Sequence, residues 1–195
     1  MAQAQDQFMT VEEFLALEEA NPEGIYEYID GYVRDLGALL MAGGSSYHAA
    51  ITNNISTALT IALRKSGRKC LVFSAQVSFR PITTRYFHPD VTVSCHPQET
   101  TRNNAEIVSA SLVVEVLSPT TEMFDRSRKL QIYSACPSIQ EYLLVDANRP
   151  FVEVYHRLPS GKMEYSTYHA DEHIPLNGLG IELPVNEIYI DIIFD

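Results

Sequence analysis

The sequence predicts an α/β (α+β) fold in which a central mixed β-sheet is flanked by two main helices. Three observations support it. Apolar residues in 47–66 recur with helical spacing, and the segment 111–117 is almost entirely apolar, which is typical of a strand buried on both faces. The segment 122–135 follows a turn and stops before a proline, which indicates a second helix. With 195 residues, 46% of them apolar, the chain is long enough for one domain over residues 1–195.

The N-terminal part is expected to form a short helix and a β-hairpin. Thr10-Val-Glu-Glu13 is a capping-box pattern that opens a helix reaching about Ala20, where a proline–glycine turn stops it. The segments 25–29 and 32–36 flank Asp30-Gly31, a dipeptide that strongly favours a tight hairpin turn.

The central part alternates one long helix with short strands. We expect a strand at 38–42, and then a helix over 47–66 that Ser45 or Ser46 caps and Gly67 ends. Further strands are predicted at 69–73, 75–80, 90–95, 111–117, 140–146, 151–158 and 163–168. The tail 173–195 is expected to contain loops, short strands and a final apolar edge, Tyr189–Phe194, which its own domain or a second copy must cover.

The charge and the cysteines limit the classes of protein. The net charge of −11 argues against strong non-specific binding to nucleic acid, although residues 64–89 carry six bases and no acid. We expect a solvated helix end and loop here, because Arg64, Lys65, Arg68 and Lys69 lie where a helix C-terminus favours cations; the alternative is a surface that follows a phosphate backbone. Three cysteines without a CxxC pair make a disulfide framework or a zinc site unexpected. We expect free thiols in a cytoplasmic protein, because no leader pattern or membrane-length apolar segment is visible.

A single acid in a buried strand is the most informative feature. Glu115 interrupts Leu112–Leu117, and an ionised carboxylate in such a place needs a partner, a proton or a metal. Asp90 begins another predicted strand, so the two acids can meet if these strands pair. Two adjacent carboxylates repel unless a cation or a proton lies between them, and oxygen ligands suit Mg²⁺ or Mn²⁺.

Three other polar residues are candidates with open alternatives. The helix after the Glu115 strand folds back, so Lys129 can return to that strand's carboxyl end; equally, it can pair with Asp125 four residues earlier. Simple alternation in the hairpin favours a solvent-facing position for Glu27. His48 is expected to be a cap-region histidine at the start of the long helix, without a catalytic role.

At this point several motifs together resemble one family. These are Pro89-Asp90, Glu115-Val-Leu-Ser-Pro-Thr-Thr121, Asp125, Lys129 with Tyr133, and Glu141-Tyr-Leu-Leu-Val-Asp146. In order and spacing they are similar to a large bacterial family of proposed restriction endonucleases with the PD-(D/E)xK, restriction-endonuclease-like fold. Glu27-Tyr-Ile-Asp-Gly31 is similar to that family's Glu-x-x-Asp-Gly hairpin. The resemblance covers about residues 8–190.

The resemblance implies a metal site and an activity. Asp90 and Glu115 would bind Mg²⁺ (or Mn²⁺), the carbonyl of Val116 would complete the inner shell, and Glu27 would be the N-terminal acid. Lys129 would replace the lysine that nucleases of this fold carry where this chain and its family have leucine. The implied function is Mg²⁺-dependent hydrolysis of DNA phosphodiester bonds by an endonuclease, in which a homodimer would cut both strands.

Two other functions stay open. One is a catalytically weak or inactive module that binds nucleic acid or protein on the same fold, which the acidic net charge favours. The other, less supported, is a metal-dependent hydrolase of a small phosphorylated molecule.

Overall fold

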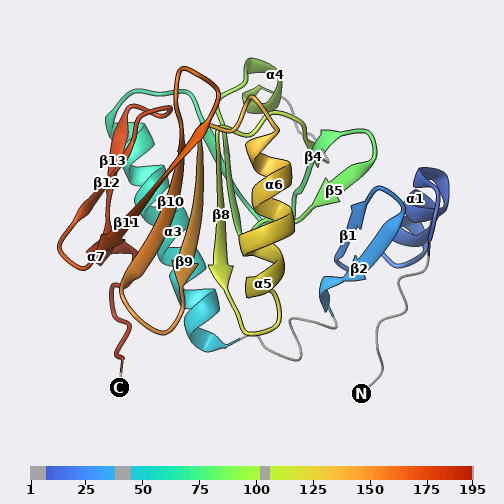
Figure 1. Cartoon of the computed structure of the whole chain (residues 1–195), viewed down its shortest axis with the longest axis horizontal. Helices are drawn as coiled ribbons and strands as arrows, with labels where there is room; N and C mark the ends of the chain where they lie inside the picture. Colours follow the sequence, from blue (N-terminus) through green and yellow to red (C-terminus); the bar gives the residue numbers. More distant parts are fainter. Residues whose placement is uncertain (1–7, 38–44, 102–105, 195) are drawn as a thin grey trace.

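The computed structural model describes residues 8–37, 45–101 and 106–194, and Figure 1 shows their arrangement. The predicted strand at 38–42 lies outside the described residues. The helices are α1 (Val11–Ala20), α3 (Ser46–Lys65), α4 (Pro97–Thr100), α5 (Glu122–Phe124), α6 (Leu130–Ser134) and α7 (Val185–Ile188). The strands are β1 (Tyr26–Ile29), β2 (Tyr32–Asp35), β3 (Leu71–Ser74), β4 (Ser78–Ile82), β5 (Arg85–Phe87), β6 (Val91–Ser94), β7 (Glu106–Ile107), β8 (Leu112–Leu117), β9 (Glu141–Asp146), β10 (Phe151–Arg157), β11 (Met163–His169), β12 (His173–Leu176) and β13 (Ile181–Pro184).

The described strands form three sheets where the sequence predicted one central sheet. The largest is a mixed sheet in the order β11-β10-β9-β8-β6-β3, in which β8 and β9 run parallel. A second sheet has the order β2-β1-β5-β4-β7, and β12 pairs with β13. The expected mixed central sheet is therefore confirmed, but the N-terminal hairpin belongs to another sheet. This second sheet also contains β5 and β7, and both strands are too short to show a periodic pattern in the sequence.

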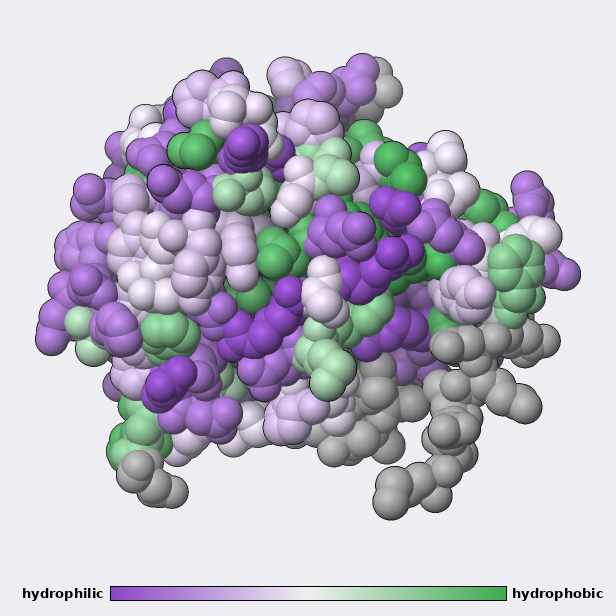
Figure 2. All heavy atoms as spheres, viewed as in Figure 1, coloured by the Kyte–Doolittle hydropathy of each residue, from purple (hydrophilic) through white to green (hydrophobic). Residues whose placement is uncertain are grey.

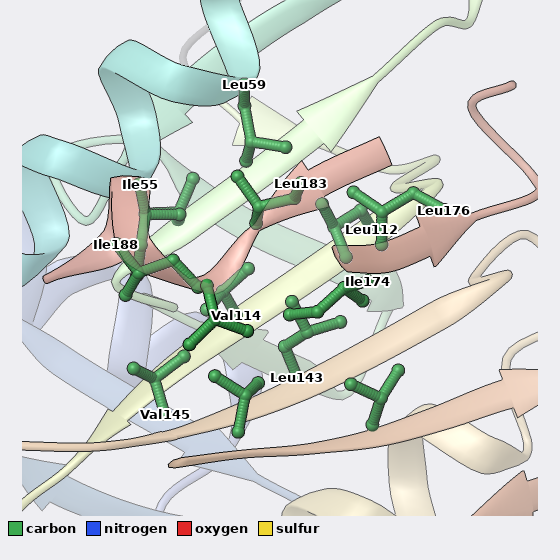
Figure 3. Close-up of a cluster of buried hydrophobic side chains, with 14 of the residues drawn as sticks. Ile55, Leu59, Leu112, Val114, Leu143, Val145, Ile174, Leu176, Leu183 and Ile188 are labelled. Atoms are coloured by element: carbon green, nitrogen blue, oxygen red, sulfur yellow. The ribbon is translucent and has the colours of Figure 1, made fainter. Parts of the chain in front are cut away.

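Each face of the large sheet is covered by a different set of elements. Helix α3 and the β12–β13 pair cover one face, where Ile55 and Leu59 pack with Val114, Leu143 and Leu183 (Figure 3). On the other face lie the helical segment α5–α6 and residues of the second sheet. Alternation along β8 thus directs Val114 and Val116 to the α3 face, and sends Glu115 to the face of the α5–α6 segment.

The predicted helix ends are confirmed. The hydroxyl of Thr10 accepts the amide of Glu13, and the Glu13 carboxylate accepts the amide of Thr10, so the capping box is complete. Ser45 caps α3 by accepting the amide of His48. After α3, Gly67 adopts a φ of +71°, which lets the chain leave the helix without Cβ strain.

The second main helix, predicted at 122–135, contains an irregular turn. Between α5 and α6 the residues Asp125–Lys129 form a π-helical turn, in which the amide of Leu130 donates to the carbonyl of Asp125 five residues before it. Both Asp125 and Lys129 are buried. Turns of this kind are rare and frequently occur at functional sites.

The cysteine prediction was wrong. Cys70 and Cys95 form a disulfide, and Cys136 is a free thiol. The register of β3 and β6 pairs Leu71 with Ser94, so the two cysteines face each other across the ends of these antiparallel strands. An odd number of cysteines is compatible with one bridge, which only the strand pairing reveals.

The apolar tail does not form the predicted edge strand. Residues 189–194 form a turn and an irregular segment, with Asp191 at a φ of +61°. The side-chain amide of Asn54 on α3 donates to the carbonyls of Ile188 (3.2 Å) and Ile190 (2.9 Å). The chain's own long helix therefore anchors this segment, while Ile190 and Ile193 remain exposed. Among the described residues, no helix has the length and apolar character that a bilayer crossing requires.

Candidate functional site

Strand pairing brings Asp90 and Glu115 together, as the sequence predicted. The register of β6 and β8 pairs Val91 with Val114, so the next position places Asp90 opposite Glu115. Asp90 Oδ2 accepts the amide of Val116 at 2.7 Å, which fixes that carboxylate at the strand end. Both acids line one cavity of about 50 Å³, enough for a few water molecules or a small hydrated ion.

Lys129 lies at the centre of three buried carboxylates. Its Nζ is 2.8 Å from Glu27 Oε1, 2.9 Å from Glu115 Oε1 and 3.3 Å from Asp125 Oδ1. The return of Lys129 to the Glu115 strand and its pairing with Asp125 are therefore both confirmed. Tyr133, one helical turn later, donates its hydroxyl to Glu115 Oε1 at 3.3 Å. The site thus combines β1, β8 and the π-helical turn.

Glu27 is fully buried, so the expectation of a solvent-facing position was wrong. Both faces of β1 are covered: Tyr28 stacks on Phe14 of α1, while Glu27 faces Lys129. Across the hairpin, Arg34 Nη1 donates to Glu27 Oε2 at 2.8 Å. Glu27 Oε1 accepts no hydrogen bond from the described residues, so its contact with Lys129 is an ion pair without hydrogen-bond alignment.

The surplus of negative charge perturbs the groups in the site. Burial raises the pKa of Glu115 well above its ordinary value; Lys129 opposes this shift, and the nearby acids Asp125, Asp90 and Glu27 reinforce it. Burial lowers the pKa of Lys129, but the carboxylates around it outweigh burial and raise that pKa, so the side chain remains an ammonium group.

Sequence reasoning missed the contact that His48 makes. Its Nε2 lies 3.3 Å from Asp90 Oδ2, where α3 begins beside the strand end. Burial lowers the pKa of His48, but its hydrogen bond and charge interaction with Asp90, together with a hydrogen bond to the Val116 backbone, raise it overall. The one signal in the sequence was its place in the first turn of a long helix, where the N–H groups favour anions.

The basic segment lies elsewhere. Helix α3 has 20 residues and spans about 30 Å, so the bases at its C-terminal end are far from the end that carries His48. Two other bases of this segment, Arg80 and Arg85, pair with Glu106 and Asp30. The structure therefore favours cations at a helix end over a surface that follows a phosphate backbone through the site.

The donor set of the cavity fits a hard divalent ion. Asp90 Oδ1 and Glu115 Oε2 accept no hydrogen bond from any described residue, and both carboxylates line the cavity. Within the described ranges, no cluster of three or more His, Cys, Asp or Glu side chains is arranged to enclose a metal. Two carboxylates with a backbone carbonyl and several waters is an arrangement that Mg²⁺ accepts, since it usually keeps part of its hydration shell.

Comparisons with known proteins agree with this fold. Residues 11–186 match the Uma2 family, described as "Putative restriction endonuclease". Two Synechocystis proteins, both described as uncharacterized, are similar to this chain. The protein slr1290 is 33% identical over 95% of this chain and 94% of its own length. The protein sll1609 is 30% identical over 81% of this chain and 86% of its own length.

A solved structure shows the same fold. The crystal structure of "a putative nuclease belonging to DUF820" from Anabaena variabilis superposes with a TM-score of 0.69 at 18% identity, covering 92% of this chain and 97% of that one. The fold is therefore the restriction-endonuclease-like fold that the motifs implied. Since the family match spans most of the sequence, the chain belongs to the Uma2 family.

Proposed function

We propose that the protein is a Mg²⁺- or Mn²⁺-dependent endonuclease that hydrolyses phosphodiester bonds of DNA. One observation carries the proposal: Asp90 and Glu115 meet at the ends of paired strands, and an ammonium group lies 2.9 Å from Glu115. The family's description as a restriction endonuclease and the nuclease description of the Anabaena structure support it.

The roles of the side chains follow from their positions. Asp90, Glu115 and the carbonyl of Val116 would hold the ion, which when bound supplies charge neutralisation at the phosphate and a water of lowered pKa. Because its pKa is raised, Lys129 remains an ammonium donor at neutral pH and acts on the charge that develops on the phosphate, rather than as a base. Glu27 and Asp125 position its Nζ.

The second candidate is an inactive interaction module on the same fold. The net charge of −11 favours it, because much of the surface would repel a duplex. The buried cluster of acids around Lys129 opposes it, since uncompensated buried charge is costly to keep without a role.

Incubation with plasmid, linear and single-stranded DNA, each with Mg²⁺ or Mn²⁺, tests the proposal. Cutting should be lost in Asp90→Asn and Glu115→Gln while both variants still melt cooperatively. Glu182→Gln, which changes an exposed carboxylate on β13, is the matched control and should cut normally. Residual cutting by both site variants at the wild-type level would identify a contaminating nuclease and favour the interaction module.

The homodimer stays a prediction. If two copies cut opposite strands, sedimentation of the wild type in the presence of duplex DNA should show two protein chains per duplex. One chain per duplex would contradict it.

A further inference from the structure

A groove with its own chemistry lies beside the carboxylate site. In the hairpin, Glu27 pairs with Arg34 and Ile29 pairs with Tyr32, so these four side chains share one face of the sheet. That face looks toward Phe124 and the exposed side of the π-helical turn. The resulting groove is lined by Ile29, Tyr32, Arg34, Phe124 and Arg128 and has a volume of about 320 Å³. In Figure 2, the region between the α5–α6 segment and the hairpin is mainly hydrophilic, with some hydrophobic side chains in it.

The groove is connected to the site by one chain of contacts, which runs through Arg34 and Glu27 to Lys129. The Arg34 guanidinium donates to Glu27, whose other oxygen meets Lys129, and it also stacks on Phe124 at 3.7 Å from the ring centroid. Arg128 directly precedes Lys129 in the π-helical turn. A chain of nucleotides with one phosphate in the site would therefore have its neighbouring nucleotide at this groove.

The side chains of the groove suit an unpaired nucleotide. Tyr32 is 51% exposed, and so presents an aromatic face on which a base can stack. Among the residues that the structure describes, the polar contacts of the Arg128 side chain are long, 3.6 Å to Asp30 and 3.4 Å to Gln131, so its guanidinium can move to a phosphate. The volume lies at the lower end of the range for small-ligand sites, which corresponds to about one nucleotide.

A second cleft beside the site is lined by acidic side chains, whereas the groove is lined by arginines. It has a volume of about 540 Å³, adjoins the metal cavity at Ile25 and His88, and carries Glu18, Glu23 and Glu106. Burial raises the pKa of Glu18, and the nearby charge of Glu106 raises it further. A phosphate backbone would be repelled from this cleft and attracted to the arginine side.

We propose that the groove between the β1–β2 hairpin and Phe124–Arg128 binds an unpaired nucleotide of single-stranded DNA next to the scissile phosphate. The inference rests on the nuclease function proposed above, and it names single-stranded DNA as the substrate class of that site. In a duplex, stacking between neighbouring base pairs would hide the base face on which Tyr32 stacks. In the acidic cleft, Arg80 is already paired with Glu106, and the described residues that line the cleft include no lysine or arginine to bind a second strand. A single strand or an unpaired end is therefore the preferred substrate, ahead of a blunt duplex.

Equilibrium binding without divalent ions tests the groove separately from cutting. Fluorescence anisotropy is measured in EDTA with a labelled oligothymidylate and with a blunt-ended duplex of two separate strands. The wild type should bind the single strand more tightly, and Tyr32→Ala should weaken this binding about tenfold. Tyr32→Phe should restore it, because the ring remains. Arg128→Gln should weaken it and reduce the slope of log affinity against log salt by about 0.7.

Two control variants match these changes. Tyr165→Ala removes a tyrosine of similar exposure (52%) on β11, and Arg64→Gln removes an exposed base at the far end of α3. Neither should change binding by more than the error of measurement.

Each result decides one of the two proposals. Unchanged binding in Tyr32→Ala, tighter binding of the duplex, or no measurable binding of the single strand by the wild type would overturn the groove. Such a result would leave the nuclease proposal intact if Asp90→Asn still abolished cutting. Conversely, the groove stands alone if single-strand binding follows the prediction but no metal-dependent cutting is found.

Discussion

Replacing Lys129 with methionine tests how the buried carboxylates are held. The substitution keeps an unbranched side chain of nearly the same length, one atom shorter, and removes the ammonium group that lies within 3.3 Å of Glu27, Glu115 and Asp125. These side chains are almost inaccessible, with relative exposures of 0%, 6% and 2%, so bulk solvent would compensate the lost cation only weakly.

The expected loss of stability follows from this burial. Removing one partner of a buried ion pair destabilises a protein by about 3–5 kcal/mol, because the remaining charge is uncompensated. Here the loss should be near the lower limit, about 3 kcal/mol, because burial already raises the pKa of Glu115 and the cluster can take up a proton. For a protein of this length, that corresponds to a decrease in Tm of about 10 °C.

Thermal unfolding followed by circular dichroism at neutral pH measures this change. Lys162→Met, in the exposed turn between β10 and β11, is the matched control and should leave the Tm unchanged. Adding Glu115→Gln to Lys129→Met should recover part of the loss, since it removes one of the stranded carboxylates. A Tm for Lys129→Met equal to that of the wild type would refute the three-carboxylate arrangement.

Three further predictions concern stability. The folded-state pKa of Glu115 is raised above its ordinary value of 4.5, so the stability that Glu115 contributes is present below pH 4.5 and is lost as the pH rises through the folded-state pKa. Glu115→Gln should lose this pH dependence of the Tm. Identical curves of Tm against pH for the wild type and Glu115→Gln would contradict this prediction. Reducing the Cys70–Cys95 bridge, which links residues 25 positions apart, should lower the free energy of unfolding by about 3 kcal/mol, as measured in urea with and without reductant; equal midpoints would mean that the two thiols are not bridged. Arg34→Met should destabilise by about 2 kcal/mol by removing a hydrogen-bond donor from buried Glu27, and a stability equal to that of the wild type would show that this donor is not needed.

Residues whose burial conflicts with their charge made much of the site predictable. Glu115 stands alone in an apolar strand, so a compensating partner was required whatever the topology. Asp90 could be placed opposite Glu115 because strands that pair bring their ends together. The register of β6 and β8 confirms that placement. Lys129 followed from the return of a helix after a strand, which is a local property of the chain.

What stayed hidden depends on contacts between distant segments. Burial of Glu27 arises because a second sheet packs its hairpin against the π-helical turn, and neither that sheet's shortest strands nor the turn has a sequence pattern. The contact of His48 with Asp90 depends on where α3 begins relative to β6. The Cys70–Cys95 bridge likewise depends on strand register rather than on cysteine spacing.

Manganese binding measured by electron paramagnetic resonance tests the central claim most directly, because Mn²⁺ itself is the probe and no substrate is needed. The account predicts saturable binding of Mn²⁺ by the wild type and by Glu182→Gln, and loss of that binding in Asp90→Asn. Asp90→Asn keeps the side-chain volume, and its folding is checked by the same melting curve. Binding of Mn²⁺ by Asp90→Asn with wild-type affinity would contradict the assignment of the ion to Asp90 and Glu115.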